Sequence, residues 1–194
     1  MQRPKVRPVT GADEAATVHT IMLAFAADPM ARWCWPDPHQ YVSTMPGFTR
    51  AFASAGFAQG GAFYTVGYAG AALWLPPGTG PEEETMGEIM ESTIAPSIRS
   101  DAMAVMEQMA KCHPEEPHWY LPLIGVDPAH QSKGHGSALL RHTLEICDRD
   151  HLSAYLESTN PRNISLYQRH GFEQLTTIQI GSSPPIVPML RSAR

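Results

Sequence analysis

The sequence predicts a mixed α/β fold in which helices cover a central sheet. Strand-like and helix-like patterns alternate through the second half of the chain, as expected for a sheet with helices packed on it. The 194 residues are 43% hydrophobic and 17% charged, which is typical of globular proteins. A chain of this length buries about 70% of its surface on folding, enough for a core without disulfides. No repeat or low-complexity linker divides it, so we expect residues 1–194 to form one domain.

In the first half, turn residues separate short elements. With 18 prolines and 15 glycines, long uninterrupted elements are not expected. Thr10 is the expected N-cap of the first helix, with Asp13 as its acidic partner, and Asp28-Pro29 is the expected end of that helix. The patterns predict a strand at 6–9, this helix, an aromatic loop at 33–36, a helix at 40–54, strands at 62–66 and 68–75, and helices at 82–90 and 101–111 separated by Pro96.

In the second half, the periodicity is clearer. Residues 140, 143, 144 and 147 form an apolar stripe at helical spacing, which predicts a helix over 137–149. The other expected elements are strands at 119–126 and 154–159, a short helix at 164–170, and a closing hairpin of 174–180 with 186–190.

Charge and cysteine content exclude several classes of function. The net charge of −5 argues against a nucleic-acid binder that relies on a basic field. The three cysteines are widely spaced, without a Cys-x-x-Cys pair, so neither a disulfide framework nor a zinc ribbon is expected. Glycines and Pro76-Pro77 interrupt the uncharged stretch 51–81, which argues against a membrane segment. We therefore expect a cytoplasmic protein without nucleic-acid or membrane partners.

The glycine loop at 126–137 is the most informative segment. It joins a predicted strand to a predicted helix, and a helix N-terminus leaves backbone N–H groups unpaired. Gly134 and Gly136 allow the backbone to approach an anion closely, and Lys133 adds a positive charge. This combination favours a phosphate or pyrophosphate ligand.

The loop differs from the two best-known phosphate motifs. The chain contains no Walker sequence. Gly134 and Gly136 match two of the three small positions of the dinucleotide fingerprint, and Glu157 lies where a ribose-binding acid would be. Leu139, however, occupies the third small position, and seven residues separate Val126 from Gly134. A nicotinamide- or flavin-dependent oxidoreductase is therefore a disfavoured alternative.

Gln131-Ser132-Lys133-Gly134-His135-Gly136 resembles the acetyl-CoA pyrophosphate loop of the GNAT superfamily of N-acetyltransferases. Residues 163–172, from Asn163 through Tyr167 to Gly171-Phe172, are similar to a second segment of that family, in family order and spacing. Residues 72–78 resemble a strand end of one branch, and residues 116–191 resemble the puromycin N-acetyltransferases. The resemblance implies a GNAT-type acyl-CoA N-acyltransferase fold, with a mixed, mostly antiparallel sheet splayed between two parallel strands and helices on both faces.

The resemblance also divides the chain and assigns roles. It implies an acceptor side at 1–115 and an acetyl-CoA-binding core at 116–194. In that core, strand backbone would pair with pantetheine, loop amides would hold the pyrophosphate, Asn163 would contact the CoA arm, and Tyr167 would lie near the thioester sulfur. The strand residues are Ile124, Gly125 and Val126, and the loop residues are Gln131, Ser132, Lys133, Gly134, His135, Gly136 and Ser137.

The implied reaction is direct attack of a primary amine on acetyl-CoA. Tyr167 is the expected general acid because a phenol, with a pKa of about 10, stays protonated at neutral pH. Glu157 is our first candidate for the general base, with Tyr120, His118 or a water chain as alternatives. Pro122 departs from the expected pattern, since proline cannot donate to a sheet; it marks either the splay or a register error.

The acceptor is expected to be a small-molecule amine. Trp33, Trp35 and Tyr120 are candidate substrate residues, because tryptophans in a Pro-bounded loop suit an apolar or aromatic amine. No metal is expected, since the histidine pairs of the chain lack companion ligands at matching spacing. A CoA-binding module without turnover is a second functional alternative. The oligomeric state is open, with a homodimer as one alternative.

Overall fold

A computed structural model describes residues 4–194, which form a seven-stranded sheet in the order β1-β2-β3-β4-β5-β7-β6. Every neighbouring pair of strands is antiparallel except β4 and β5, which are parallel. The strands are β1 Val6–Pro8, β2 Ala62–Thr65, β3 Gly70–Leu75, β4 His118–Val126, β5 Ser153–Ser158, β6 Glu173–Gln174 and β7 Val187–Arg191. The predicted mixed, mostly antiparallel sheet is confirmed.

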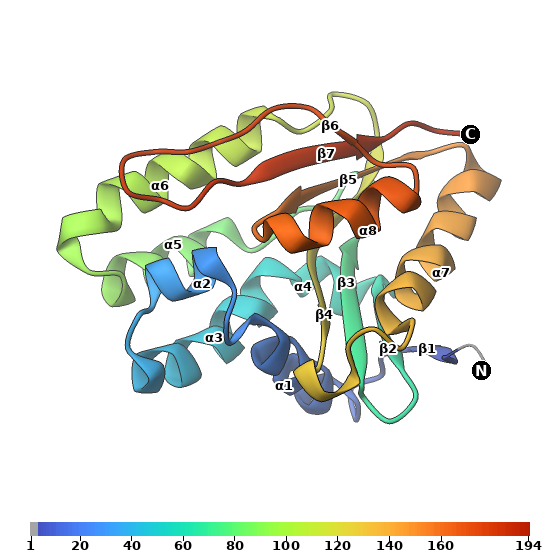
Figure 1. Cartoon of the computed structure of the whole chain (residues 1–194), viewed down its shortest axis with the longest axis horizontal. Helices are drawn as coiled ribbons and strands as arrows, with labels where there is room; N and C mark the ends of the chain where they lie inside the picture. Colours follow the sequence, from blue (N-terminus) through green and yellow to red (C-terminus); the bar gives the residue numbers. More distant parts are fainter. Residues whose placement is uncertain (1–3) are drawn as a thin grey trace.

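The sheet opens between its two parallel strands. β4 and β5 pair only from His118 opposite Ser153 to Leu121 opposite Leu156. Pro122 follows at once, where the register between β3 and β4 also shifts. Because proline has no N–H to donate, its place at this bulge is where the ladder can end at low cost. Pro122 therefore marks the splay, and Figure 1 shows β3 and β4 diverging from β5 and β7.

Helices cover both faces of the sheet, as predicted (Figure 1). One face packs against α7 and α8, and the other against α1, α3, α4, α5 and α6. The helices are α1 Glu14–Phe25, α2 Pro29–Cys34, α3 Pro38–Phe52, α4 Ser54–Ala58, α5 Glu83–Thr93, α6 Pro96–Lys111, α7 His135–Asp150 and α8 Ile164–Arg169, with short 3-10 turns at Pro128–His130 and Pro161–Asn163. No helix within residues 4–194 has both the length and the hydropathy needed to cross a bilayer.

Strand alternation sends neighbouring side chains to two separate cores. Trp74 and Leu156 pack with Leu140 of α7 on one face, whereas Leu73 and Tyr155 pack toward α3 and α6 on the other. These side chains are almost fully buried. Burying each such residue contributes roughly 1.5–3 kcal/mol.

Two prolines begin helices at places where the sequence predicts none. The expected aromatic loop at 33–36 is partly helical, since α2 runs from Pro29 to Cys34. The Asp28 carboxylate accepts hydrogen bonds from Met30 N and Ala31 N, so Asp28-Pro29 caps a new helix. Likewise α6 begins at Pro96 and not at Asp101.

Two further boundaries differ. α1 begins at Glu14, three residues later than a Thr10 N-cap requires, and the Asp13 carboxylate accepts from Thr10 N at 3.0 Å. The expected closing hairpin is shorter, because β6 spans only Glu173–Gln174 and is followed by one isolated bridge between Ile178 and Ile186.

Candidate active site

The part of β4 beyond the splay carries an unpaired edge. Ile124, Gly125 and Val126 pair with β3, but none of them pairs with β5. Helix α1 packs closely over this segment, since a Cβ atom on Gly125 would overlap with the Cβ of Ala24. Because this edge has no strand partner beyond Leu121 within residues 4–194, an extended ligand could add to it as a further strand.

The glycine loop delivers backbone N–H groups to the end of this edge. Ser132 has φ 60° and Gly134 has φ 86°, both in the left-handed region. The 16-residue helix α7 begins directly afterwards at His135, and no side chain caps its first turn. Its N-terminal amides and its dipole are therefore available to an anion.

The side chains of this loop contact the protein itself. Lys133 Nζ donates to Ala129 O at 2.9 Å, and Gln131 Nε2 donates to Val126 O at 3.4 Å. Ser137 Oγ lies 3.1 Å from His170 Nε2, and His135 Nδ1 lies 3.0 Å from the Thr65 hydroxyl. Main-chain groups, more than side chains, thus form the candidate anion site.

Tyr167 lies on α8 and is 5% exposed. It packs in the same cluster as Ile124 of β4 and edge-on against Phe172. Burial, and secondarily the charge of Asp28, raises the pKa of Tyr167 well above its ordinary value. The phenol is therefore a proton donor throughout the neutral range. Asn163, just before α8, is exposed.

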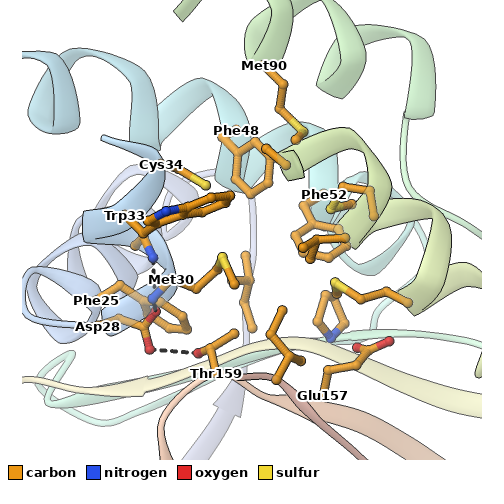
Figure 2. Close-up of a pocket in the computed structure, with 18 of the residues that line it drawn as sticks. Phe25, Asp28, Met30, Trp33, Cys34, Phe48, Phe52, Met90, Glu157 and Thr159 are labelled. Atoms are coloured by element: carbon orange, nitrogen blue, oxygen red, sulfur yellow. Dashed lines mark hydrogen bonds between the residues drawn. The ribbon is translucent and has the colours of Figure 1, made fainter. Parts of the chain in front are cut away.

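An apolar cavity lies where the sheet splays, with about 720 Å³ of empty space when the open solvent at its mouth is included. Trp33 and Trp35, both predicted substrate residues, are part of its wall. Figure 2 shows Trp33, Phe48 and Phe52 on one side of the cavity, and Glu157 of β5 and Thr159, which follows that strand, on the other. Trp33 Nε1 donates to Ser182 Oγ, and Trp35 Nε1 donates to Thr93 Oγ1.

Two carboxylates interrupt this apolar wall. Asp28 accepts from Met30 N at 3.0 Å, Ala31 N at 3.1 Å and the Thr159 hydroxyl at 2.6 Å. Burial raises the pKa of Asp28 despite these hydrogen bonds. Asp28 was not predicted as a site residue; its position before Pro29, as an N-cap, was the available signal.

Glu157, the predicted base, is the second carboxylate. Its side chain is 2% exposed, and its Oε1 has no hydrogen-bond partner. His113 Nε2 lies 3.4 Å from that oxygen. The phenols of Tyr120 and Tyr155 face it, and burial followed by the charge of Glu157 raises the pKa of both. Glu157 is thus a buried acceptor with unsatisfied capacity at the cavity wall.

A wider outer groove of about 1750 Å³, including open solvent, lies beside the inner cavity. The two share Phe52, Met90, Met106 and Met109 as lining residues. His113, His118 and Tyr120 line the outer groove, so Tyr120 is separated from the two tryptophans of the inner cavity. Tyr167 lines neither space.

Other reactive groups contribute little here. Cys34 lines the inner cavity, but burial and the charge of Asp28 raise the pKa of its thiol to about 12. It is therefore a thiol and not a nucleophilic thiolate. Within residues 4–194, no three His, Cys, Asp or Glu side chains are grouped as a metal site requires.

Comparison with known proteins gives one family. Residues 27–172 match the model of the acetyltransferase (GNAT) family. An uncharacterized N-acetyltransferase of Schizosaccharomyces pombe is 34% identical over 71 residues, which cover 37% of this chain and 29% of that protein.

Solved structures match along almost the whole chain. A Corynebacterium glutamicum protein described as histone acetyltransferase HPA2 and related acetyltransferase has a TM-score of 0.71 at 26% identity, covering 100% of this chain and 98% of the other. Arylalkylamine N-acetyltransferase 2 from Aedes aegypti has a TM-score of 0.67 at 13% identity, covering 100% of both chains, and shows likeness of fold.

Proposed function

Because the chain belongs to the GNAT family of acetyltransferases, we propose that it transfers an acetyl group from acetyl-CoA to the primary amine of a small apolar or aromatic molecule. One observation carries this proposal: a buried, unsatisfied Glu157 carboxylate lies in the wall of an otherwise apolar cavity at the splay of the sheet. Such a cavity suits an amine whose nitrogen meets the carboxylate while its body packs on Trp33 and Phe48.

The acetyl-CoA side of the proposal rests on the β4 edge and on the N-terminus of α7. Ile124, Gly125 and Val126 would pair with the pantetheine amides, and Asn163 would contact the CoA arm. The amides from Gln131 to Ser137 would hold the pyrophosphate. When bound, acetyl-CoA supplies an activated acyl carbon and a thiolate leaving group.

The chain's own residues would move two protons. Glu157 takes one from the incoming ammonium, which must be neutral to attack. Tyr167 gives one to the departing sulfur, and its raised pKa keeps the phenol protonated for that step. A backbone N–H near Ile124 would polarise the thioester carbonyl, worth about 3 kcal/mol by analogy with other oxyanion donors. The Cys34 thiol, with its pKa raised to about 12, favours direct attack over an acetyl-cysteine route.

The division of the chain follows from these assignments. Residues 1–115 contribute Trp33, Trp35 and much of the apolar wall, and we assign them to the acceptor side of one domain. Residues 116–194 form the acetyl-CoA-binding core. The similarity of 116–191 to puromycin N-acetyltransferases stays a prediction, as does a homodimer. Three unpaired cysteines are in keeping with a reducing compartment such as the cytoplasm.

A thiol-release assay tests the proposal. Purified protein is incubated with acetyl-CoA and a panel of amines that differ in apolar bulk and in number of charges. We expect free thiol to appear with aromatic and aliphatic monoamines more rapidly than with diamines. Binding of CoA without thiol release for any amine would instead indicate a non-catalytic acyl-CoA-binding module.

The two cavity carboxylates offer a matched pair of variants. Glu157→Gln should lower kcat by about 100-fold or more at neutral pH and change the pH–rate profile, because a general base contributes about 10²–10⁴-fold. Asp28→Asn should lower kcat much less, because Asp28 already accepts three hydrogen bonds. An unaltered pH–rate profile in Glu157→Gln would remove Glu157 from the base role.

A further inference from the structure

A row of polar groups leads from the inner cavity to the outer groove. Glu157 Oε1 lies 3.4 Å from His113 Nε2. His113 Nδ1 lies 3.2 Å from His118 Nε2, and His118 Nδ1 lies 2.7 Å from the Glu116 carbonyl oxygen. Glu157 lines the inner cavity, while both histidines line the groove. The row is therefore a continuous path between the two spaces.

When both histidines are neutral, the contact between His118 and the Glu116 carbonyl determines which ring nitrogens carry hydrogen. A carbonyl oxygen only accepts, so His118 must carry its hydrogen on Nδ1 toward Glu116. His118 Nε2 is then an acceptor, and His113 must donate to it from Nδ1. Neutral His113 consequently turns a bare Nε2 lone pair toward the Glu157 carboxylate. Two acceptors therefore face each other, and one additional proton would join them as a hydrogen bond.

We propose that His113, oriented by His118, accepts the substrate's proton from Glu157 and passes it to solvent in the outer groove. This inference rests on the proposed acetyl transfer and adds the exit route for its proton. His113 acts through Glu157 and does not contact the amine, and His118 is a positioning residue.

The proton balance is complete. Glu157 takes a proton from the ammonium, leaving a neutral amine and a carboxyl group. The carboxyl group gives that proton to His113 Nε2, which restores the carboxylate and forms an imidazolium. The imidazolium then loses its Nε2 proton to water in the outer groove, since the His113 side chain is 26% exposed. It keeps the Nδ1–H that donates to His118, so the starting tautomer is restored. The attacking nitrogen loses a second proton when the amide forms, and this proton replaces the one that Tyr167 gives to the sulfur. The net change is therefore one proton moved from the ammonium to water.

The surroundings favour a transient positive charge on His113. The rings of Tyr155 and Tyr120 lie 4.4 and 4.5 Å from its ring, and the Cys112 thiol is its chain neighbour. Neither phenol carries charge, because their pKa values are raised by burial. The groove is lined by four glutamates and by no lysine or arginine; the glutamates are Glu83, Glu107, Glu115 and Glu116. Glu107 is paired with Lys111 at 2.6 Å, so the other three glutamates supply the negative field that an imidazolium meets in the groove.

Chemical rescue tests the relay. His113→Ala should lower kcat for an apolar amine by at least about 10-fold while leaving the KM for acetyl-CoA unchanged. Added imidazole should restore kcat in proportion to its concentration, whereas wild-type kcat should not respond. His142→Ala is the matched control, since this half-buried histidine packs against Phe63 on the opposite face of the sheet. It should neither lose kcat nor respond to imidazole.

A second readout needs neither substrate nor variant. Nitrogen NMR reports which ring nitrogen of a neutral histidine carries hydrogen. The free protein is labelled with nitrogen-15 at histidine, and spectra are recorded at a pH at which the imidazole rings are neutral. We expect the Nδ1–H form for both His113 and His118, although free histidine favours Nε2–H. An Nε2–H form on neutral His113 would overturn the proposal. This measurement decides the question even where His113→Ala does not fold.

The outcomes separate the relay from the function on which it rests. Wild-type protein that releases no thiol with any amine contradicts the proposed acetyl transfer. Wild-type protein that turns over, together with a folded His113→Ala of undiminished kcat or without imidazole rescue, contradicts only the relay.

Discussion

At the scale of single residues, two buried carboxylates in one cavity wall have different surroundings. Asp28 caps α2 and accepts three hydrogen bonds, so its acceptor capacity is largely used within the protein. Glu157 keeps one oxygen without a partner. A buried acceptor of that kind costs free energy unless a ligand or proton satisfies it. The unsatisfied group is therefore the better candidate for chemistry, and the satisfied one for structure.

Replacement of Tyr167 by Phe tests the general acid. The change removes only the hydroxyl and keeps the packing against Phe172. We expect kcat at saturating amine to fall by about 100-fold with little change in Tm, measured by thiol release and thermal melting. The raised pKa of Tyr167 also means that wild-type activity should show no loss from this group up to about pH 10. Unchanged turnover in Tyr167→Phe would contradict the role.

Asp28→Asn tests the cost of a buried charge. Burial raises the native pKa of Asp28 above its unfolded value, so the native state favours the protonated form. That stabilisation is complete below the unfolded pKa of about 4 and is lost as pH rises through the native pKa. Asparagine keeps the acceptor for Met30 N and Ala31 N without the charge. We expect Asp28→Asn to melt a few degrees above wild type near pH 8, with a smaller difference near pH 5. A wild-type Tm above that of the variant at both pH values would contradict this.

At the scale of elements, prolines and close backbone approaches determine where the site lies. Pro29 begins α2, which carries Trp33 into the cavity wall, and Pro122 ends the pairing of β4 with β5. Gly125 lets α1 pack directly over the β4 edge. The helix and the strand edge are therefore coupled, so packing changes there should affect ligand binding.

Gly125→Ala tests this coupling. The added Cβ would overlap with Ala24, and overpacking of this kind costs about 1–3 kcal/mol. We expect a lower Tm and weaker CoA binding by calorimetry. Gly87→Ala is the control: it lies in α5 with open space around a new Cβ, and it should stabilise the protein by about 0.5–1 kcal/mol without weakening CoA binding. Equal CoA affinity in Gly125→Ala and wild type would contradict the coupling.

At the scale of the whole molecule, one splayed sheet brings together two sites built from different parts of the chain. The β4 edge and α7 come from the second half, whereas most of the cavity wall comes from α2, α3, α5 and α6. Both meet where β4 leaves β5. A ligand on the β4 edge should therefore stabilise the native state as a whole.

Thermal melting with CoA tests this expectation. A ligand at 100 times its Kd adds about 2.7 kcal/mol to the unfolding free energy, which for a chain of this length raises Tm by roughly 5–10 °C. We expect this shift with CoA or acetyl-CoA and none with NADH or NADPH. A shift of the same size with a nicotinamide cofactor would favour the oxidoreductase alternative.

Local patterns in the sequence were sufficient for most of the elements and for the glycine loop between β4 and α7. The stripe along α7 and the loop before it are contiguous, and their hydrogen bonding depends on residues a few positions apart. Boundaries were less predictable: α1 ends shortly before Asp28-Pro29, as predicted, but the same pair also caps α2, which was not predicted. The pairing of segments 174–180 and 186–190 was overestimated, because apolar alternation alone does not specify hydrogen-bonded partners.

By itself, then, the amino-acid sequence determined the fold class, the order of most elements and the glycine loop ahead of α7. Only the tertiary structure decided that Glu157 lines the same cavity as Trp33 and Asp28 and lies next to His113. His113 and Glu157 are far apart in the chain and adjacent in space because the segment before β4 folds back over the paired strands, where the His113 ring packs on Tyr120 of β4 and Tyr155 of β5. Contacts of that kind follow from strand order and burial, which no short stretch of sequence encodes.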